Sequence, residues 1–81
     1  PIAYTHTNDT TLRLHQARPV TFVHQEKPGT ILSIDKNGIL IAAGEHAILV
    51  ERIQFPGAKV MAVADWLHAE RGQLYLGLVL Q

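Results

Sequence analysis

The 81-residue sequence contains no cysteine, which excludes disulfide bonds, thiolate zinc sites and thiol nucleophiles. It also lacks an excess of charge of either sign, because seven Lys and Arg balance seven Asp and Glu. A dedicated nucleic-acid-binding domain usually carries a basic excess, so composition alone does not favour that function. The lack of cysteine is compatible with a reducing compartment.

Long apolar runs are missing too. No run approaches the roughly 18 residues of a transmembrane helix, so no membrane partner is expected. The chain nevertheless has enough apolar residues to fold, since 47% are hydrophobic and only 17% are charged. Its length leaves room for one hydrophobic core, and we expect a single domain over residues 1–81. The first residue is Pro1, as expected of a processed protein or of a piece of a longer polypeptide.

Motifs for catalysis and for phosphate binding are absent. The six glycines form neither a dinucleotide-binding nor a Walker pattern. Ser33 lies outside any nucleophile elbow, and with Asp35 it is interpreted as a polar pair at a strand end. None of the five histidines has the spacing of a zinc motif, and they are expected to face solvent: His6, His15, His24, His46 and His68. No catalytic, cofactor-binding or metal-binding residue is predicted.

The sequence does contain short β-strand signals separated by turns. Residues 12–16 alternate apolar and polar side chains, which indicates a half-buried strand, and residues 2–5 are expected to pair with it around an Asn8-Asp9 turn. Residues 20–24 are rich in β-forming side chains and predict another strand. Three further strands are expected over residues 30–35, 39–43 and 47–55.

The turns between these last strands have their own signals. Asn37-Gly38 supplies the positive φ angles of a tight hairpin, and Pro56-Gly57 ends the β region. The strand over residues 39–43 is apolar at every position, so both of its faces are expected to be covered. The five aromatic side chains are expected mainly in the core: Tyr4, Phe22, Phe55, Trp66 and Tyr75.

One helix is expected near the end of the chain. Apolar residues at helical spacing predict it over Ala62 to Arg71, with Gly72 closing it. Residues 74–80 alternate leucine with other residues, which is compatible with a closing strand or with an irregular segment packed on the core. Five or six short strands with one helix predict a mainly β fold, a small β-barrel.

Several sequence motifs occur together in a recognisable order. They are Lys27-Pro28-Gly29-Thr30-Ile31-Leu32, Asp35-Lys36-Asn37-Gly38-Ile39 and Ala42-Ala43-Gly44, followed by Gln54, Gly57, Lys59, Met61 and Asp65. In this order the chain resembles the C-terminal domain of methionyl-tRNA formyltransferase and its formyltransferase relatives. The chain departs from the family pattern at Glu45-His46, in the residues after Gly72 and at two further positions. Ala58 stands where a second basic residue is common, and Ala62 replaces the Ser or Thr that would cap the helix.

The resemblance implies an open β-barrel similar to the OB fold, placed after a larger N-terminal catalytic domain. In the family that domain binds 10-formyltetrahydrofolate and carries the catalytic residues, so this chain alone is expected to be non-catalytic. The implied role is a cytoplasmic one in translation initiation, namely an accessory domain that helps bind the formyl acceptor, methionyl-tRNA. Two alternatives stay open: a small amine or amino-sugar nucleotide as the acceptor, or a structural or oligomerisation module.

Three cations are the candidate acceptor contacts. Lys59 is placed by the family pattern. Arg13 and Arg52 are chosen because strand alternation points them outward, Arg52 away from Glu51. If these cations lie scattered on the fold, they are ordinary solubilising charges. If they lie on one face, the tRNA interpretation is favoured.

Overall fold

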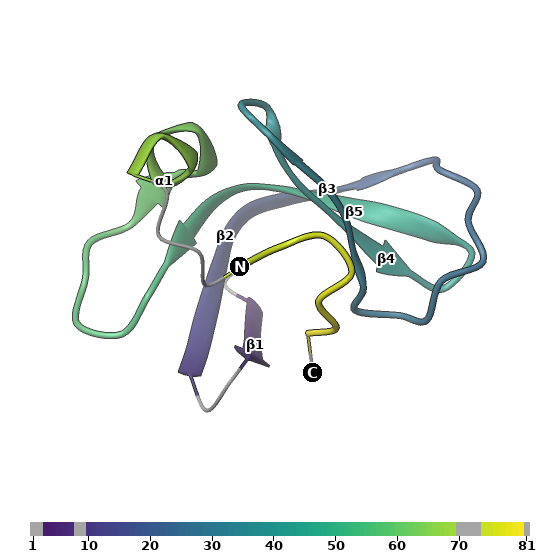
Figure 1. The fold of residues 1–81 in the computed structure, drawn as a ribbon, viewed down its shortest axis with the longest axis horizontal. Helices are drawn as coiled ribbons and strands as arrows, with labels where there is room; N and C mark the ends of the chain where they lie inside the picture. The colour runs from purple at the N-terminus through teal and green to yellow at the C-terminus, as the bar shows by residue number, and fades with distance from the viewer. Residues whose placement is uncertain (1–2, 8–9, 70–73, 81) are drawn as a thin grey trace.

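The computed structural model describes residues 3–7, 10–69 and 74–80. Its strands are β1 (Ala3–Thr7), β2 (Thr10–Val20), β3 (Ile31–Asp35), β4 (Gly38–Ala43), β5 (His46–Gln54) and β6 (Met61–Ala62), and its helix is α1 (Val63–Ala69). They form one antiparallel sheet in the order β1-β2-β5-β4-β3, with β6 beside β5 (Figure 1). The two strands at the ends of this order, β1 and β3, do not pair with each other among the described residues, so the curved sheet stays open. This confirms the prediction of a mainly β fold with an open barrel.

The N-terminal hairpin is confirmed, because β1 pairs with β2 from Ala3–Leu14 to Thr7–Thr10. The Asn8-Asp9 turn lies outside the described residues. The predicted strand over residues 20–24 is wrong. β2 instead continues to Val20, and residues 21–30 form an irregular connection. Within β2, Gln16 has a left-handed φ of 48° between the pairs that flank it, so the strand bends there.

The three consecutive strands β3, β4 and β5 pair as predicted, but their first turn is shifted by one residue. Asp35 already pairs with Gly38, so the two turn residues are Lys36 and Asn37, and the positive φ falls on Gly38 alone. A Cβ at Gly38 would lie 2.5 Å from the Val50 carbonyl oxygen. Glycine is therefore required here by the approach of β5 as well as by the turn.

Helix α1 follows β6 directly and lies against β3, β4, β5 and β6. It begins one residue after the predicted start at Ala62, and its predicted end, Arg71 with Gly72, lies outside the described residues. Val63 and Trp66, three residues apart on one face, are buried, so the helix closes the core on its side of the sheet. No described helix is both long and apolar enough to cross a bilayer.

The segment over residues 74–80 is the irregular alternative, with a single bridge between Thr30 and Val79. It is the yellow trace in Figure 1, which passes below β3 and β5 in this view. Its backbone is held by bonds from Ile31 N–H to the Leu78 oxygen (2.8 Å), from Gly77 N–H to the Ile31 oxygen (3.0 Å) and from Leu80 N–H to the Gly29 oxygen (2.8 Å). The segment thereby places Leu74 and Leu80 in the core.

The core described combines side chains from β2, β3, β4, β5, α1 and residues 74–80. Its members are Leu12, Ile31, Ile39, Ile41, Val50, Ile53, Val63, Trp66, Leu74 and Leu80. The first five residues of β4 are buried, as expected for a strand covered on both faces. The expectation that the aromatics are core residues is wrong for Phe22 and Tyr75, which are 44% and 52% exposed, because both lie in irregular segments. It holds for Trp66, and the side chain of Tyr4 is outside the described set.

Candidate functional site

The paired ends of β2 and β5 carry a polar surface on the side away from the core. Leu14 pairs with Ile53, and both belong to the core packing. Because strand side chains alternate, the neighbours of this pair point the other way. These neighbours form the cross-strand pairs Arg13–Gln54 and His15–Arg52, and we refer to these four residues as the outer face.

Gln54 ties the outer face to the loop that follows β5. Its Oε1 lies 3.1 Å from His15 Nε2, and its Nε2 donates to the Ala58 carbonyl oxygen at 3.0 Å. Since an amide oxygen only accepts, the hydrogen in the first bond belongs to His15 Nε2. One glutamine thus connects β2, β5 and the residue just before Lys59.

The loop over residues 55–60 has a defined turn of its own. Ala58 N–H donates to the Phe55 carbonyl oxygen at 3.1 Å, and Gly57 has a φ of 74°. Proline followed by a glycine with positive φ is the signature of a type II turn. Both ends of the turn are anchored, because Phe55 packs against the core and Ala58 is held by Gln54. Exposed Lys59 therefore follows a fixed turn.

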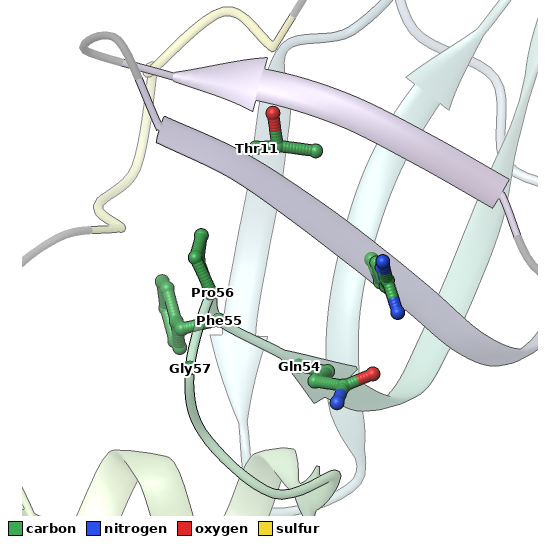
Figure 2. Close-up of a pocket in the computed structure, with 6 residues that line it drawn as sticks. Thr11, Gln54, Phe55, Pro56 and Gly57 are labelled. Atoms are coloured by element: carbon green, nitrogen blue, oxygen red, sulfur yellow. The ribbon is translucent and has the colours of Figure 1, made fainter.

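A cavity of about 410 Å³ opens where β5 leaves β2. The ladder between the two strands ends at the Arg13–Gln54 pair, and the chain then turns away while β2 runs on beside β1. Figure 2 shows Phe55 and Pro56 on the loop, across from Thr11 on β2. The lining residues are Thr11, Arg13, Gln54, Phe55, Pro56 and Gly57.

The structure places two of the three predicted contact residues on one face of the sheet and the third on the loop that follows β5. Arg13 is exposed and Arg52 half-buried on the outer face, two ladder positions apart, and Lys59 lies on the adjoining loop. Sequence reasoning did not single out Thr11, His15 or Phe55 for this region, and it noted Gln54 only as part of the family pattern. The signal that was available is the Pro56-Gly57 turn directly after a strand, which marks the point where two paired strands separate.

Other candidate groups lie elsewhere or have structural partners. Among the described residues no three His, Asp or Glu side chains gather in a metal-binding arrangement. Asp35 accepts the Asn37 N–H at 2.8 Å, which agrees with its interpretation as a strand-end residue. Arg18, the other arginine of β2, lies 3.3 Å from Glu51 in an exposed ion pair.

Comparison with known proteins agrees with the motif resemblance. The family model for the formyl transferase C-terminal domain matches residues 1–71. Proteins named methionyl-tRNA formyltransferase from Legionella pneumophila strains Corby and Paris are 52% and 51% identical to the chain over 81 residues. These matches take in 100% of this chain but only 26% of each relative.

Proposed function

Because the chain belongs to the formyl transferase C-terminal domain family, we propose that it binds the formyl acceptor, methionyl-tRNA, for a larger formyltransferase. In this proposal the chain is one domain of a cytoplasmic parent protein. An N-terminal catalytic domain in the rest of the parent is its first partner. The 52% identity to proteins named methionyl-tRNA formyltransferase supports tRNA over a small amine as the acceptor.

The observation that carries this proposal is that Arg13 and Arg52 share the outer face, with exposed Lys59 on the loop that follows β5. Phosphate contacts from Lys and Arg supply most of the affinity of non-specific RNA binding. A chain whose net charge is zero has no net electrostatic attraction for RNA at long range. RNA binding by such a chain therefore needs cations that lie close to one another on its surface. Gln54 fixes the backbone before Lys59 through its bond to Ala58, and a cation carried by an ordered backbone leaves less backbone entropy to be lost on binding.

Formyl transfer itself is assigned to the parent protein outside this chain. The resemblance implies 10-formyltetrahydrofolate as the donor there. Among the described residues that line the cavity beside the outer face there is one arginine and no carboxylate or histidine, so these residues do not form a transfer site. An acid–base pair within reach of the reacting amine is what such chemistry needs. We therefore expect no formyl transfer by the 81-residue chain, measured with the donor and methionyl-tRNA present.

Titration of labelled methionine tRNA with the 81-residue chain tests the binding role. We expect dissociation constants near the non-specific range of roughly 10⁻⁴ to 10⁻⁶ M, weakening steeply with salt. Lys59→Ala should lower the affinity and reduce the slope of log K against log salt by about 0.7–0.9. Lys36→Ala removes an exposed lysine from the distant β3–β4 turn and serves as the matched control, with an unchanged slope.

Two results would contradict the proposal. Absence of tRNA binding to the wild type at low salt would favour the small-acceptor or structural alternatives. Equal losses of affinity for Lys59→Ala and Lys36→Ala would mean that the general charge of the chain attracts the RNA, and that Lys59 has no particular part in binding.

A further inference from the structure

A group of apolar side chains is exposed at the end of the β2–β5 ladder that lies away from the outer face. Pro19 and Ile48 form a cross-strand pair there, so their side chains point to the same side of the sheet, and both are exposed. Phe22 and Val23 follow in the irregular connection after β2 and are 44% and 82% exposed. We refer to these four residues as the apolar end.

The connection that carries Phe22 and Val23 is held in place on both sides of them. Before them, the last residue of β2 is still paired with β5. After them, His24 Nε2 donates to the His46 carbonyl oxygen at 2.6 Å, and His24 Nδ1 accepts the Glu26 N–H at 3.1 Å. A carbonyl oxygen only accepts, so the ring hydrogen belongs to Nε2. The two apolar side chains are thus presented by an ordered backbone, which lowers the cost of binding a partner.

We propose that the apolar end is the surface on which the rest of the parent protein docks. The occupant is the folded part of the parent that precedes Pro1, and it covers the apolar end with side chains of its own. This inference rests on the proposed function, in which the chain is one domain of a larger formyltransferase. It deepens that function by assigning the contact surface between the two parts.

The relatives contain enough additional chain to reach this surface. The 81 residues match only 26% of a relative, so about three times their length lies outside the match. A compact body of that length, about 230 residues, has a radius of gyration of roughly 17 Å. Ala3 of β1 pairs with Leu14, and Pro19 lies five residues further along β2, at most about 17 Å away. A body joined to the chain ahead of β1 therefore spans the distance to the apolar end.

The chemistry of the apolar end favours a protein as the occupant. Exposed apolar groups that lie together within polar surroundings are typical of protein–protein contacts, and aromatic side chains such as Phe22 are enriched at the centres of these contacts. On the connection and the β4–β5 turn, the exposed carboxylates of Glu26 and Glu45 outnumber the exposed Lys27, so this end does not attract RNA. Pro19 has no N–H to donate to an added strand, so the contact is made by side chains.

Hydroxyl-radical footprinting of the 81-residue chain and of the full-length parent protein tests the proposal, because radical labelling reports the exposure of each side chain. Labelling of Phe22 should be at least about fivefold lower in the parent, since a side chain at the dry centre of a contact loses nearly all of its exposure. Tyr75, which is 52% exposed on residues 74–80, is the internal control and should be labelled equally in both proteins. Equal labelling of Phe22 in the two proteins, or an equal fall at Tyr75, would overturn the proposal.

Two variants of the parent locate the contact. Val23→Asp places a charge in the proposed contact and should raise the labelling of Phe22 in the parent at least about twofold, because a buried unpaired carboxylate opposes docking. Ala64→Asp adds the same charge to an exposed position of α1, at the opposite end of the molecule in Figure 1, and should leave that labelling unchanged. Denaturation of the same variants of the 81-residue chain shows that each folds. An equal rise for both variants would overturn the assignment of the apolar end.

The tRNA titration separates this inference from the proposed function. If tRNA binds in a Lys59-dependent way while Phe22 is labelled equally in the chain and in the parent, the docking surface is wrong and the acceptor role stands. If Phe22 is protected in the parent but neither protein binds tRNA, the acceptor role is wrong and the docking surface stands. Sedimentation detects the competing occupant, because a dimer of the 81-residue chain that protects Phe22, with no protection in the parent, would make a second copy the partner and overturn the proposal.

Discussion

Two regions of the molecule, the surroundings of Gly29 and the outer face, differ in the interactions that hold them together and in the side chains they expose. Around Gly29, backbone hydrogen bonds to β4 and to residues 77–80 combine with buried leucines and isoleucines. On the outer face, polar side chains from two strand ends meet a short loop through one glutamine. Apolar burial dominates folding energetics, whereas an exposed cation contributes little to stability. Substitutions in the first region should therefore change stability, and those in the second should change binding.

The largest effect expected is that of Gly29→Ala. Gly29 has a φ of 94°, and an added Cβ would collide with the backbone oxygen of Leu80. Left-handed strain of about 1–2 kcal/mol and the release of a buried leucine, worth about 2–5 kcal/mol, should lower the free energy of unfolding by roughly 5 kcal/mol. That is comparable to the total stability of a small domain, about 5–15 kcal/mol. Urea denaturation followed by fluorescence of the single, buried Trp66 measures it.

Gly44→Ala is the matched control for that prediction. Gly44 also has a positive φ, 62°, but an added Cβ there has no atom within 4 Å. Only the backbone strain remains, so a loss of about 1–2 kcal/mol is expected. If both alanine variants lose the same free energy of unfolding, the contact between Gly29 and Leu80 does not anchor residues 77–80.

A smaller loss of stability is expected from Ile53→Ala, which truncates a core side chain on the opposite side of β5 from the outer face. Ile53 is fully buried between Arg52 and Gln54, and its truncation should cost about 3 kcal/mol. Ile48 lies on the same strand but is 36% exposed, so Ile48→Ala should cost distinctly less. Denaturant midpoints give both values. tRNA affinity, measured on the folded fraction of Ile53→Ala, should equal that of the wild type, and a drop would show that the two regions are coupled.

Gln54→Ala sharpens the comparison at the residue that joins the outer face to the loop. It removes the bonds to His15 and Ala58 and should cost about 1–2 kcal/mol of stability. Because the loop before Lys59 is then released, tRNA affinity should fall several-fold more than stability accounts for. Gln54→Glu keeps an acceptor for His15 but cannot donate to Ala58, so it should lose affinity as well. Gln25→Ala, an exposed glutamine of the irregular connection, is the control and should change neither quantity.

Local signals were sufficient for most strands and insufficient for long-range contacts. The hairpins follow from turn residues and alternation within a few positions, which is why β1–β2 and β3–β4–β5 were predicted. The strand over residues 20–24 was wrong because β propensity does not supply a partner strand. The approach of Gly29 to Leu80 joins residues 51 positions apart, and periodicity carries no signal for it.

The candidate site likewise has features that the local sequence predicts and features that depend on long-range contacts. Alternation placed Arg13 and Arg52 on the outside, and the family pattern supplied Lys59. The bond between His15 and Gln54 spans 39 positions, and the cavity exists only because β5 leaves β2 after Gln54. Neither follows from residue order, because each depends on the register between strands that are distant in sequence.

The smallest effect expected is a gain of stability from Ala62→Ser. Helix α1 begins at Val63, so Ala62 is its N-cap residue and has no side-chain oxygen to accept the orphan N–H of the first turn. A serine at this position should accept the N–H of Asp65 and raise the free energy of unfolding by about 1 kcal/mol. Ala64→Ser is the control, because it adds the same hydroxyl to an exposed position inside the helix and should cost a few tenths of a kcal/mol, or about 0.5 at most.

Ala62 also pairs with Arg52 of the outer face. Equal tRNA affinity for Ala62→Ser and the wild type would show that the helix start stabilises the core side alone, whereas a changed affinity would show that it also sets the position of Arg52.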